Sequence, residues 1–449
     1  MWEALLFHRS PTLRDRPPPP VKGYITAVNP TTGFDVNREH VKVLPGTHFG
    51  ILGGLGGVYD DALRDKVRVG TYVQVMHARR LDDKATNTVT ADEVLLRDDW
   101  NEEPEGMGVI DRVVSTGAEP VFQADGYRIR ITSATEISYA EGLKTLGDVG
   151  TNTWLRYEGK RDEAGVLVAS KARFFPAKLI LLKRALMHES WDMSPKPVGN
   201  SERGPNSPPM KQGNVLNADG SLNQDAEVQY GGYQFNDDAH RIPMDPPLQE
   251  RVRRVGMSVV PAYQKLLPDD DPSKIHFRFY AVEDEKNRAA ICSYNGIIYI
   301  PTQILQRLRS NDQLAAVLAD GVAYNLQRQA AKMEAGKSTS ILGYYAGDVV
   351  AANIPGIGVQ TAAGGGINTP QTEEQRGRVA LALMADAGYD PWQAPEAWRL
   401  LAPKKLPKDL DSLKYPDRSG YQLRILNLQY REKAAGESTG AVPTVSAGK

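Results

Sequence analysis

The sequence predicts a multidomain protein in which two small all-β barrels of the OB type are followed by an α+β domain. The chain has 449 residues, more than one ordinary hydrophobic core accommodates. Between Val21 and Leu182, short runs alternate apolar and polar residues and are separated by Gly, Asn and Asp turns, as in half-buried strands. After Pro247 the apolar residues recur at helical spacing, so the structural class changes there.

The overall composition is that of a soluble globular protein. Hydrophobic residues make up 41% and charged residues 24% of the chain, and the formal net charge is −1. Phosphate binding needs a concentrated excess of Lys and Arg, so this balance argues against nucleic acid as a partner. The single cysteine, Cys292, excludes an intrachain disulfide framework and a cysteine-based metal cluster.

The chain shows neither a membrane-spanning pattern nor a secretory signal. Its longest weakly charged stretch, Ile341 to Ile367, is interrupted by Asp348, Pro355 and many glycines, too often to span a bilayer. Residues 1–9 lack a basic region followed by a long apolar core. We therefore expect no transmembrane segment and no signal peptide in the chain as given.

The β region repeats itself. Gly23-Tyr24-Ile25 corresponds to Gly108-Val109-Ile110, and Val69-Gly70-Thr71 corresponds to Val149-Gly150-Thr151. Two copies of a short multi-stranded unit suit small closed barrels of the OB type, because closure removes exposed strand edges. An OB barrel that binds single-stranded nucleic acid has a basic groove with exposed aromatics, whereas acidic residues slightly outnumber basic ones here. Barrels used for spacing or protein contact are the expectation.

These signals divide the chain into six segments. The expected order is a Pro-rich segment (1–20), a first barrel (21–100), a second barrel (106–182), an extended linker arm (183–246), the α+β domain (247–435) and a disordered tail (436–449). Within the α+β domain the sequence predicts a helix over 248–260, a strand over 275–282, a hairpin turning at Asn295-Gly296 into the strand 297–300, and helices over 302–308, 312–332 and 373–387.

A series of short motifs in the α+β domain follows an order seen in one peptidase family. The motifs are Arg251-Val252-Arg253-Arg254-Val255-Gly256, Phe279-Tyr280-Ala281-Val282-Glu283-Asp284, Asn295-Gly296-Ile297-Ile298-Tyr299-Ile300, Ser310-Asn311-Asp312-Gln313-Leu314-Ala315-Ala316-Val317-Leu318-Ala319 and Asp386-Ala387-Gly388-Tyr389-Asp390-Pro391. This series resembles the minigluzincin zinc metallopeptidases, the family of HtpX, BepA and the CAAX prenyl proteases, over roughly residues 247–401. The resemblance implies a zincin-type α+β fold.

The positions that carry zinc chemistry in that family hold other residues here. In the family, Leu-Ala-Ala-Val-Leu-Ala leads into His-Glu-x-x-His, in which two histidines on one helix face bind zinc and the Glu is the general base. Here the first ligand position is Asp320, the base position is Gly321 and the second ligand position is Tyr324. The third ligand position matches Gln375, and a one-residue shift would place Glu374 there.

Histidine content gives a second argument that needs no alignment. From Pro247 to the end of the chain the only histidine is His276, which falls in a predicted strand. A zinc hydrolase site on this scaffold uses two histidines, so the sequence predicts that this domain holds no zinc. Asp320 could pair with Glu373 or Glu374 across two helices, but a solvated or Arg-paired structural role is the default, for example with Arg328 or Arg378.

The leading hypothesis is therefore a non-catalytic pseudo-metallopeptidase that binds a protein or peptide, or acts as a scaffold. Its former cleft, flanked by an edge strand, would bind an extended peptide by strand addition. The expected binding residues are Ile297, Ile298, Tyr299, Ile300, Asp320, Tyr324 and Glu374. The family resemblance implies a periplasmic or extracellular location, in conflict with the missing signal.

Two other functions stay open. One is an active metallopeptidase with a non-standard metal site, built from Asp320 and Glu374 with a ligand such as His240 borrowed from the arm. The other is a structural subunit of an envelope assembly or filament, in which the barrels and the Tyr-rich arm make contacts between subunits. A homo-oligomer would fit either a scaffold or a filament.

Overall fold

The computed structural model describes two separate compact units of the chain. The described residues are 21–36, 39–53, 59–76, 78–80, 88–97, 104–140, 142–162, 164–176, 196–197, 233–235, 240–243, 245–271, 273–283, 291–292, 296–327, 370–401 and 418–429. The first unit comprises residues 1–100 with 404–424, and the second comprises 101–403 with 425–449. The Pro-rich segment, most of the linker arm, Arg328 and the expected tail lie outside the described residues.

The first unit contains a closed barrel. Its strands are β1 (Val21–Asn29), β2 (Gly33–Val36), β3 (Glu39–Ile51), β4 (Tyr72–Met76), β5 (Arg79–Arg80) and β6 (Thr88–Leu96), with the 3-10 helix η1 (Asp61–Lys66) between β3 and β4. The order is β3-β2-β1-β4-β6-β5, and a parallel pairing of β3 with β6 closes the sheet. Alternate apolar side chains such as Ile25, Phe34 and Val73 fill its interior.

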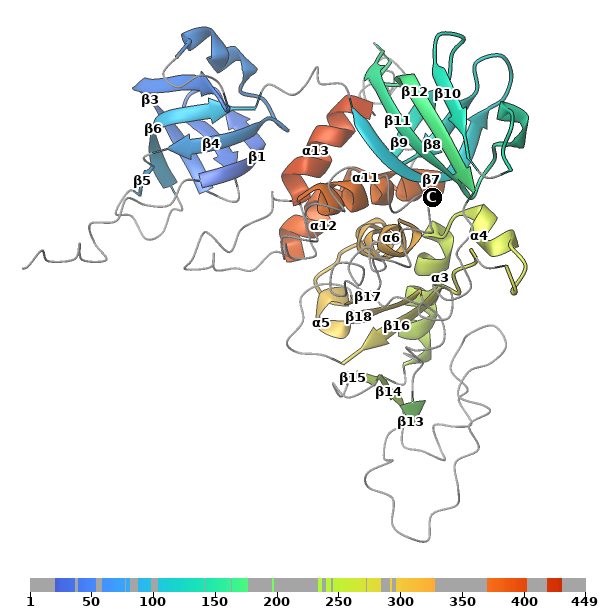
Figure 1. Ribbon diagram of the computed structural model, residues 1–449. Helices are drawn as coiled ribbons and strands as arrows, with labels where there is room; N and C mark the ends of the chain where they lie inside the picture. Colours follow the sequence, from blue (N-terminus) through green and yellow to red (C-terminus); the bar gives the residue numbers. More distant parts are fainter. Residues whose placement is uncertain are drawn as a thin grey trace, which may run out of the picture. The chain divides into compact units, whose positions relative to one another are not determined.

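The second unit begins with another barrel (Figure 1), in which the five main strands have the same connectivity and the sixth differs. Its strands are β7 (Glu105–Ser115), β8 (Val121–Ala124), β9 (Tyr127–Arg130), β10 (Glu136–Tyr139), β11 (Thr153–Arg161) and β12 (Leu167–Pro176), with the 3-10 helix η2 (Leu146–Asp148). The order is β10-β12-β11-β7-β8-β9, closed by a parallel pairing of β9 with β12. The two barrels predicted from strand alternation are thus present.

In both barrels, one threonine hydroxyl makes the same pair of hydrogen bonds to the backbone. In the first, the Thr47 hydroxyl accepts a hydrogen bond from the Leu44 amide and donates one to the Ala91 carbonyl. In the second, the Thr135 hydroxyl accepts from the Thr132 amide and donates to the Ala169 carbonyl. Each threonine is buried, so its hydroxyl satisfies two backbone groups inside the barrel.

A helical domain with a small sheet follows in the second unit. Its elements are α3 (Pro246–Val259), α4 (Ala262–Leu266), β16 (Arg278–Val282), β17 (Ile291–Cys292), β18 (Ile297–Pro301), α5 (Thr302–Leu305), α6 (Asn311–Leu326), α11 (Pro370–Asp386) and α12 (Gln393–Leu401). The last helix, α13 (Arg418–Gln429), is divided between the units, with residues 418–424 in the first and 425–429 in the second. Three short strands of the arm region, β13 (Lys196–Pro197), β14 (Tyr233–Phe235) and β15 (His240–Ile242), form a separate sheet. Barrels followed by an α+β domain are therefore observed, as predicted.

The small sheet corrects one prediction. Its order is β16-β18-β17, with β18 parallel to β16 and antiparallel to β17. The strand 297–300, expected at the edge, is therefore the middle strand, and all of its side chains are buried. An unbroken apolar run is the pattern of a strand covered on both faces, which explains the burial. His276 also lies just before β16 rather than in a strand, and its side chain is exposed.

The outer edge of β16 is closed by one side chain from α3. The Gln249 amide nitrogen donates to the carbonyls of Ala281 and Pro243, and its amide oxygen accepts from the Ala281 backbone amide. Both backbone groups of Ala281 that would pair with an added strand are thus already bonded. The same side chain ties the end of β15 to the sheet through Pro243.

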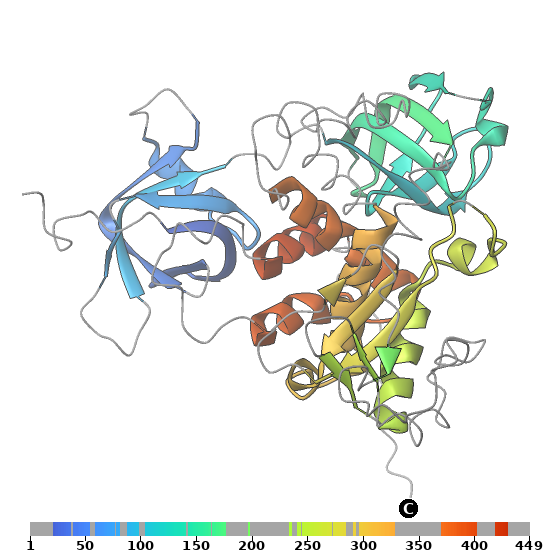
Figure 2. The ribbon, with the colours of Figure 1, turned by 60° about the horizontal axis from the view of Figure 1, so that its bottom comes forward.

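Helix α3 packs closely on β16, as Figures 1 and 2 both show. Gly256 lies in its buried face, where a Cβ atom would be only 2.3 Å from Cγ of Phe279. The expected helix over 248–260 is therefore confirmed, with a glycine that permits the close approach. Helix α6 begins at Ser310, whose side chain accepts from the Gln313 amide, and is buried from Gln313 to Leu326.

We predict that Gly256→Ala destabilises the second unit by about 1–3 kcal/mol, because the added methyl group overlaps the Phe279 ring. The matched control is Gly150→Ala, a site in the same unit where an added Cβ meets nothing within 4 Å. That control should change stability by no more than about 0.5 kcal/mol. Calorimetric unfolding of both variants measures the difference, and equal effects would refute close packing of α3 on β16.

A buried charge cluster and a barrel contact on helices α6 and α11

The three positions that matched zinc ligands lie on α6 and α11, two neighbouring helices. Asp320 and Tyr324 are on α6 and are buried, with exposed fractions of 7% and 8%. Their neighbour on α11 is Arg376, whose Nε lies 3.1 Å from Oδ1 of Asp320. Arg376 also donates to Glu373 at 2.6 Å, and its guanidinium carbon lies 5.7 Å from the centre of the Tyr324 ring. A protein cation thus stands beside the carboxylate at the first ligand position.

The cluster places one positive group between two carboxyl groups. Burial raises the pKa of Asp320 to about 7, and the charge of Glu373 adds to this effect, while Arg376 opposes it. Asp320 is therefore Arg-paired, as expected, but with Arg376. Arg378, suggested as a partner, pairs elsewhere, and Arg328 lies outside the described residues.

The side chains at these positions do not fit a zinc ion. Structural and catalytic zinc sites use several His, Cys or carboxylate ligands around one point. Here one carboxyl group is ion-paired to a guanidinium, the next position is Gly321 and the second ligand position is a phenol. Among the residues that the structure describes, no three His, Cys, Asp or Glu side chains gather as a metal site would require. The His240 side chain is not described.

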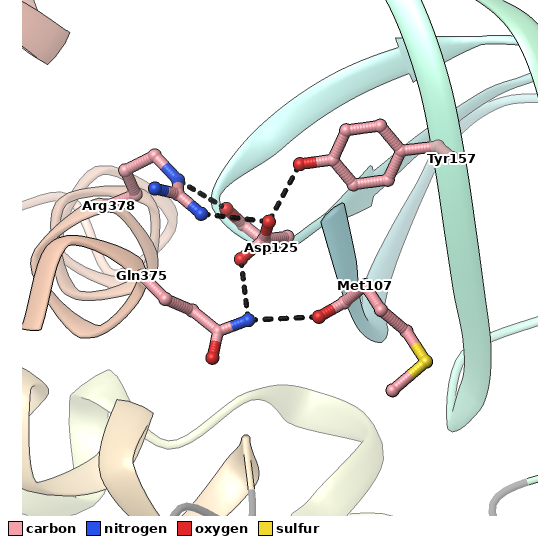
Figure 3. A network of polar contacts seen from close by, with 5 residues as sticks. All are labelled: Met107, Asp125, Tyr157, Gln375 and Arg378. Carbon is pink, nitrogen blue, oxygen red and sulfur yellow. Dashed lines mark hydrogen bonds and ion pairs between the residues drawn. The ribbon is translucent and has the colours of Figure 1, made fainter. Parts of the chain in front are cut away.

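Gln375, the residue at the third ligand position, points to the second barrel (Figure 3). Its amide nitrogen donates to the Met107 carbonyl and to Oδ1 of Asp125, each at 2.9 Å. Asp125 also accepts from Nη2 of Arg378 at 2.8 Å and from the Tyr157 hydroxyl at 2.7 Å. We call these five residues the Asp125 latch. The side chain at the third ligand position, Gln375, is therefore bonded to the second barrel.

The tip of the β8–β9 hairpin shapes the latch. Asp125 and Gly126 form the turn with φ of 55° and 74°, the left-handed conformation that Asp tolerates and Gly favours. A Cβ on Gly126 would lie 2.5 Å from the Arg378 carbonyl carbon, so only glycine lets α11 approach the turn. On the barrel side, a Cβ on Gly108 would lie 2.6 Å from the Asp125 amide nitrogen. The contact therefore depends on backbone shape as well as charge.

The second barrel covers a polar stripe along α11. Gln375 and Arg378 meet Asp125, and at the end of the helix Asp386 accepts from Gln123 and Arg112, both at 2.6 Å. These positions share one face of a helix. Residues 373 and 376 face α6 instead, so α11 lies between the barrel and α6, as Figure 1 shows. Its two faces make different contacts.

Sequence reasoning missed Asp125 and Arg376. The Asp-Gly pair between two apolar runs was a readable hairpin signal, but nothing in the pattern says what the turn touches. Arg376 stands three residues after Glu373, a spacing that predicts an ion pair on one helix face. Of the predicted binding residues, the structure brings Asp320 and Tyr324 together and places Ile297 to Ile300 inside the sheet. Glu374 is partly exposed on α11.

Comparison with known proteins supports a distant peptidase-like relationship. No protein-family model matches the chain. The chain is 27% identical over 199 residues to a protein of Vibrio cholerae serotype O1 (strain ATCC 39315 / El Tor Inaba N16961) named "Putative beta-barrel assembly-enhancing protease". The match covers 41% of this chain and 40% of that protein, so the chain spans about two fifths of its relative. Within the described residues, no helix is long and apolar enough to cross a membrane.

We predict that Arg376→Met destabilises the second unit by about 3–5 kcal/mol, because it leaves two buried carboxyl groups without their cation. Arg399→Met is a matched control: Arg399 also pairs with a Glu three residues before it, but its side chain is 65% exposed. Its loss should cost at most about 1 kcal/mol. Adding Asp320→Asn to Arg376→Met should recover part of the stability. Chemical denaturation gives these values, and equal losses in both Arg variants would contradict the cluster.

We predict that Gln375→Glu, which would supply a zinc-ligand type at that position, destabilises the second unit by about 2–4 kcal/mol. The new carboxylate would face Oδ1 of Asp125 and the Met107 carbonyl, and neither can donate a hydrogen bond. Adding Asp125→Asn would supply a donor amide, so the double variant should be more stable than the sum of the single effects. A double-mutant cycle measures this coupling, and an additive result would mean that residue 375 does not contact the barrel.

Proposed function

We propose that the chain is a non-catalytic pseudo-metallopeptidase that binds extended segments of other proteins. The observation that carries the proposal is the ion pair of Arg376 with Asp320 and Glu373. A guanidinium beside the first ligand position repels a metal cation and uses the carboxyl group that would hold it. Gly321 leaves no side chain to activate a water molecule. Accordingly, the domain is proposed to bind no zinc.

The relative's printed name supports a role in protein assembly for this chain. That protein is called a beta-barrel assembly-enhancing protease, a name that couples a peptidase with β-barrel assembly. We extend only the assembly part to this chain and place it in the periplasm or outside the cell. The two barrels are proposed to be of the OB type, since each pairs its five main strands in the order 1-2-3-5-4-1.

The small sheet indicates where an extended segment would add. β18 pairs on both sides, and Gln249 occupies the edge of β16 at Ala281. Among the described residues, β17 pairs only with β18. Strand addition is therefore proposed at β17 (Ile291–Cys292) rather than at the strand 297–300, because added strands need unpaired backbone groups.

The test combines metal analysis, cleavage and binding on the purified full-length chain. We expect zinc far below one ion per chain, no cleavage of a peptide library, and capture of extended peptides on an array of overlapping segments from a β-barrel membrane protein. Capture should be unchanged by a chelator. Cleavage that a chelator abolishes would overturn the proposal.

A control variant separates true activity from a contaminating protease. A non-standard metal site would have to use Asp320, so Asp320→Asn should abolish any cleavage that the chain itself performs. Cleavage that persists in this variant comes from a contaminant and leaves the non-catalytic function intact. Failure to capture any peptide on the array would remove the peptide-binding function.

A further inference from the structure

A second polar cluster fastens the barrel to the C-terminal end of α11. The Gln123 amide nitrogen donates to Oδ1 of Asp111 at 2.9 Å and to Oδ2 of Asp386 at 2.6 Å. Arg112 donates to Oδ1 of Asp386 at 2.6 Å. One amide group thus serves two carboxyl groups that belong to different elements. This cluster, here called the Asp111 fastening, is separate from the Asp125 latch.

A β-bulge aims Asp111 at this position. The pairing of β7 with β8 runs from Ile110 opposite Ala124 to Arg112 opposite Gln123, so Asp111 is the extra residue. Bulges turn a side chain out of the regular alternation, which lets adjacent residues approach one partner. Asp111 and Arg112 therefore both reach the cluster formed by Gln123 and Asp386.

The first barrel has the same bulge with a different side chain. There the register shifts between Ile25 and Ala27, and the extra residue is Thr26, whose hydroxyl donates to the Asp35 carbonyl. The bulge is thus common to both barrels, whereas the acid occurs only in the second. A carboxyl group at this point is not needed to form the barrel.

The surroundings of Asp111 favour its neutral form. The residue is only 6% exposed, and its Oδ2 atom is buried without a hydrogen-bond partner. Ionisation would place a charge on this buried group, and no donor at Oδ2 would stabilise that charge, whereas the protonated group carries none. The charged groups that face it are Asp386 on α11 and Arg112 on its own strand. Arg128, on β9, borders a small cavity next to Gln123.

We propose that the Asp111 fastening is a proton-controlled contact between the second barrel and α11, closed while Asp111 is protonated and weakened when it ionises. On ionisation the carboxyl O–H bond breaks and the proton passes to solvent. The carboxylate that remains faces Asp386, with one arginine for two negative groups. Repulsion between the two carboxylates then weakens the contact between the second barrel and α11.

The direction of the pH effect follows from the environment of the acid. Burial raises the pKa of Asp111 well above its ordinary value, and the charge of Asp386 raises it further, while Gln123 and Arg112 lower it. In the unfolded chain the pKa of an Asp carboxyl group is about 3.9. A raised folded-state pKa gives stability that is present at low pH and is lost as pH rises through that folded-state pKa.

Hydrogen exchange on the full-length chain tests this inference. We expect protection of β7 and of residues 380–386, corrected for the intrinsic exchange rate, to fall by at least about tenfold between about pH 5 and about pH 9. Asp111→Asn keeps the acceptor for Gln123 but does not titrate, so the protection of β7 in this variant should fall much less with pH than in the wild type. Strand β1 of the first barrel, with Thr26 at its bulge, is the internal control and should not change.

A second variant keeps the test decisive if Asp111→Asn does not fold. Asp386→Asn removes the like charge, so the loss of protection in β7 should move to lower pH. The proposal is overturned if wild-type protection of β7 is flat over this range. It is equally overturned if Asp111→Asn shows the same pH dependence as the wild type, or if Asp386→Asn leaves the transition in place. It concerns barrel and helix alone, and holds whether or not the domain binds peptides.

Discussion

The second unit depends on one buried carboxylate, that of Asp125, which holds a helix and a barrel together. It accepts from Tyr157 within the barrel and from Gln375 and Arg378 on α11, so it satisfies donors of both domains at once. Charge-assisted hydrogen bonds of this kind are stronger than neutral ones, and a buried donor left without a partner is costly. The barrel and the helical domain are consequently parts of one compact unit.

That constraint also determines what α11 can present on its other face. With residues 375 and 378 engaged by the barrel, the helix turns Glu373 and Arg376 toward α6. The guanidinium then neutralises carboxyl groups that lie close together in a buried place, a task that a metal ion performs in many hydrolases. In this protein Arg376, rather than a metal ion, compensates the negative charge of the buried carboxyl groups.

The fold could be predicted from the sequence where periodicity carried the information. Strand alternation gave both barrels, and helical spacing with Ser310 and Gly388 as end signals gave α6 and α11. The run 297–300 was misassigned to an edge, although four apolar residues in succession favour a strand covered on both faces.

The site was less predictable because its contacts are polar and distant in sequence. The stripe on α11 that meets the barrel includes Gln375, Arg378 and Asp386, and the sequence predicts barrel partners for none of them. Long-range pairs such as Gln375 with Asp125 leave no mark on local spacing. By contrast, the poor match of Asp320 and Tyr324 to zinc ligands can be predicted from the sequence, because it depends only on residue chemistry. The contacts that Arg376 and Gln375 make instead are visible only in the three-dimensional structure.

The engagement of Gln375 has an evolutionary consequence. A position without contacts can change alone, whereas the amide of Gln375 bonds to Met107 and Asp125 of another domain. A carboxylate at position 375 would face two acceptors, so it would be tolerated best together with a change in the barrel turn. Residue 375 of α11 and residue 125 of the barrel are therefore expected to vary together among related sequences.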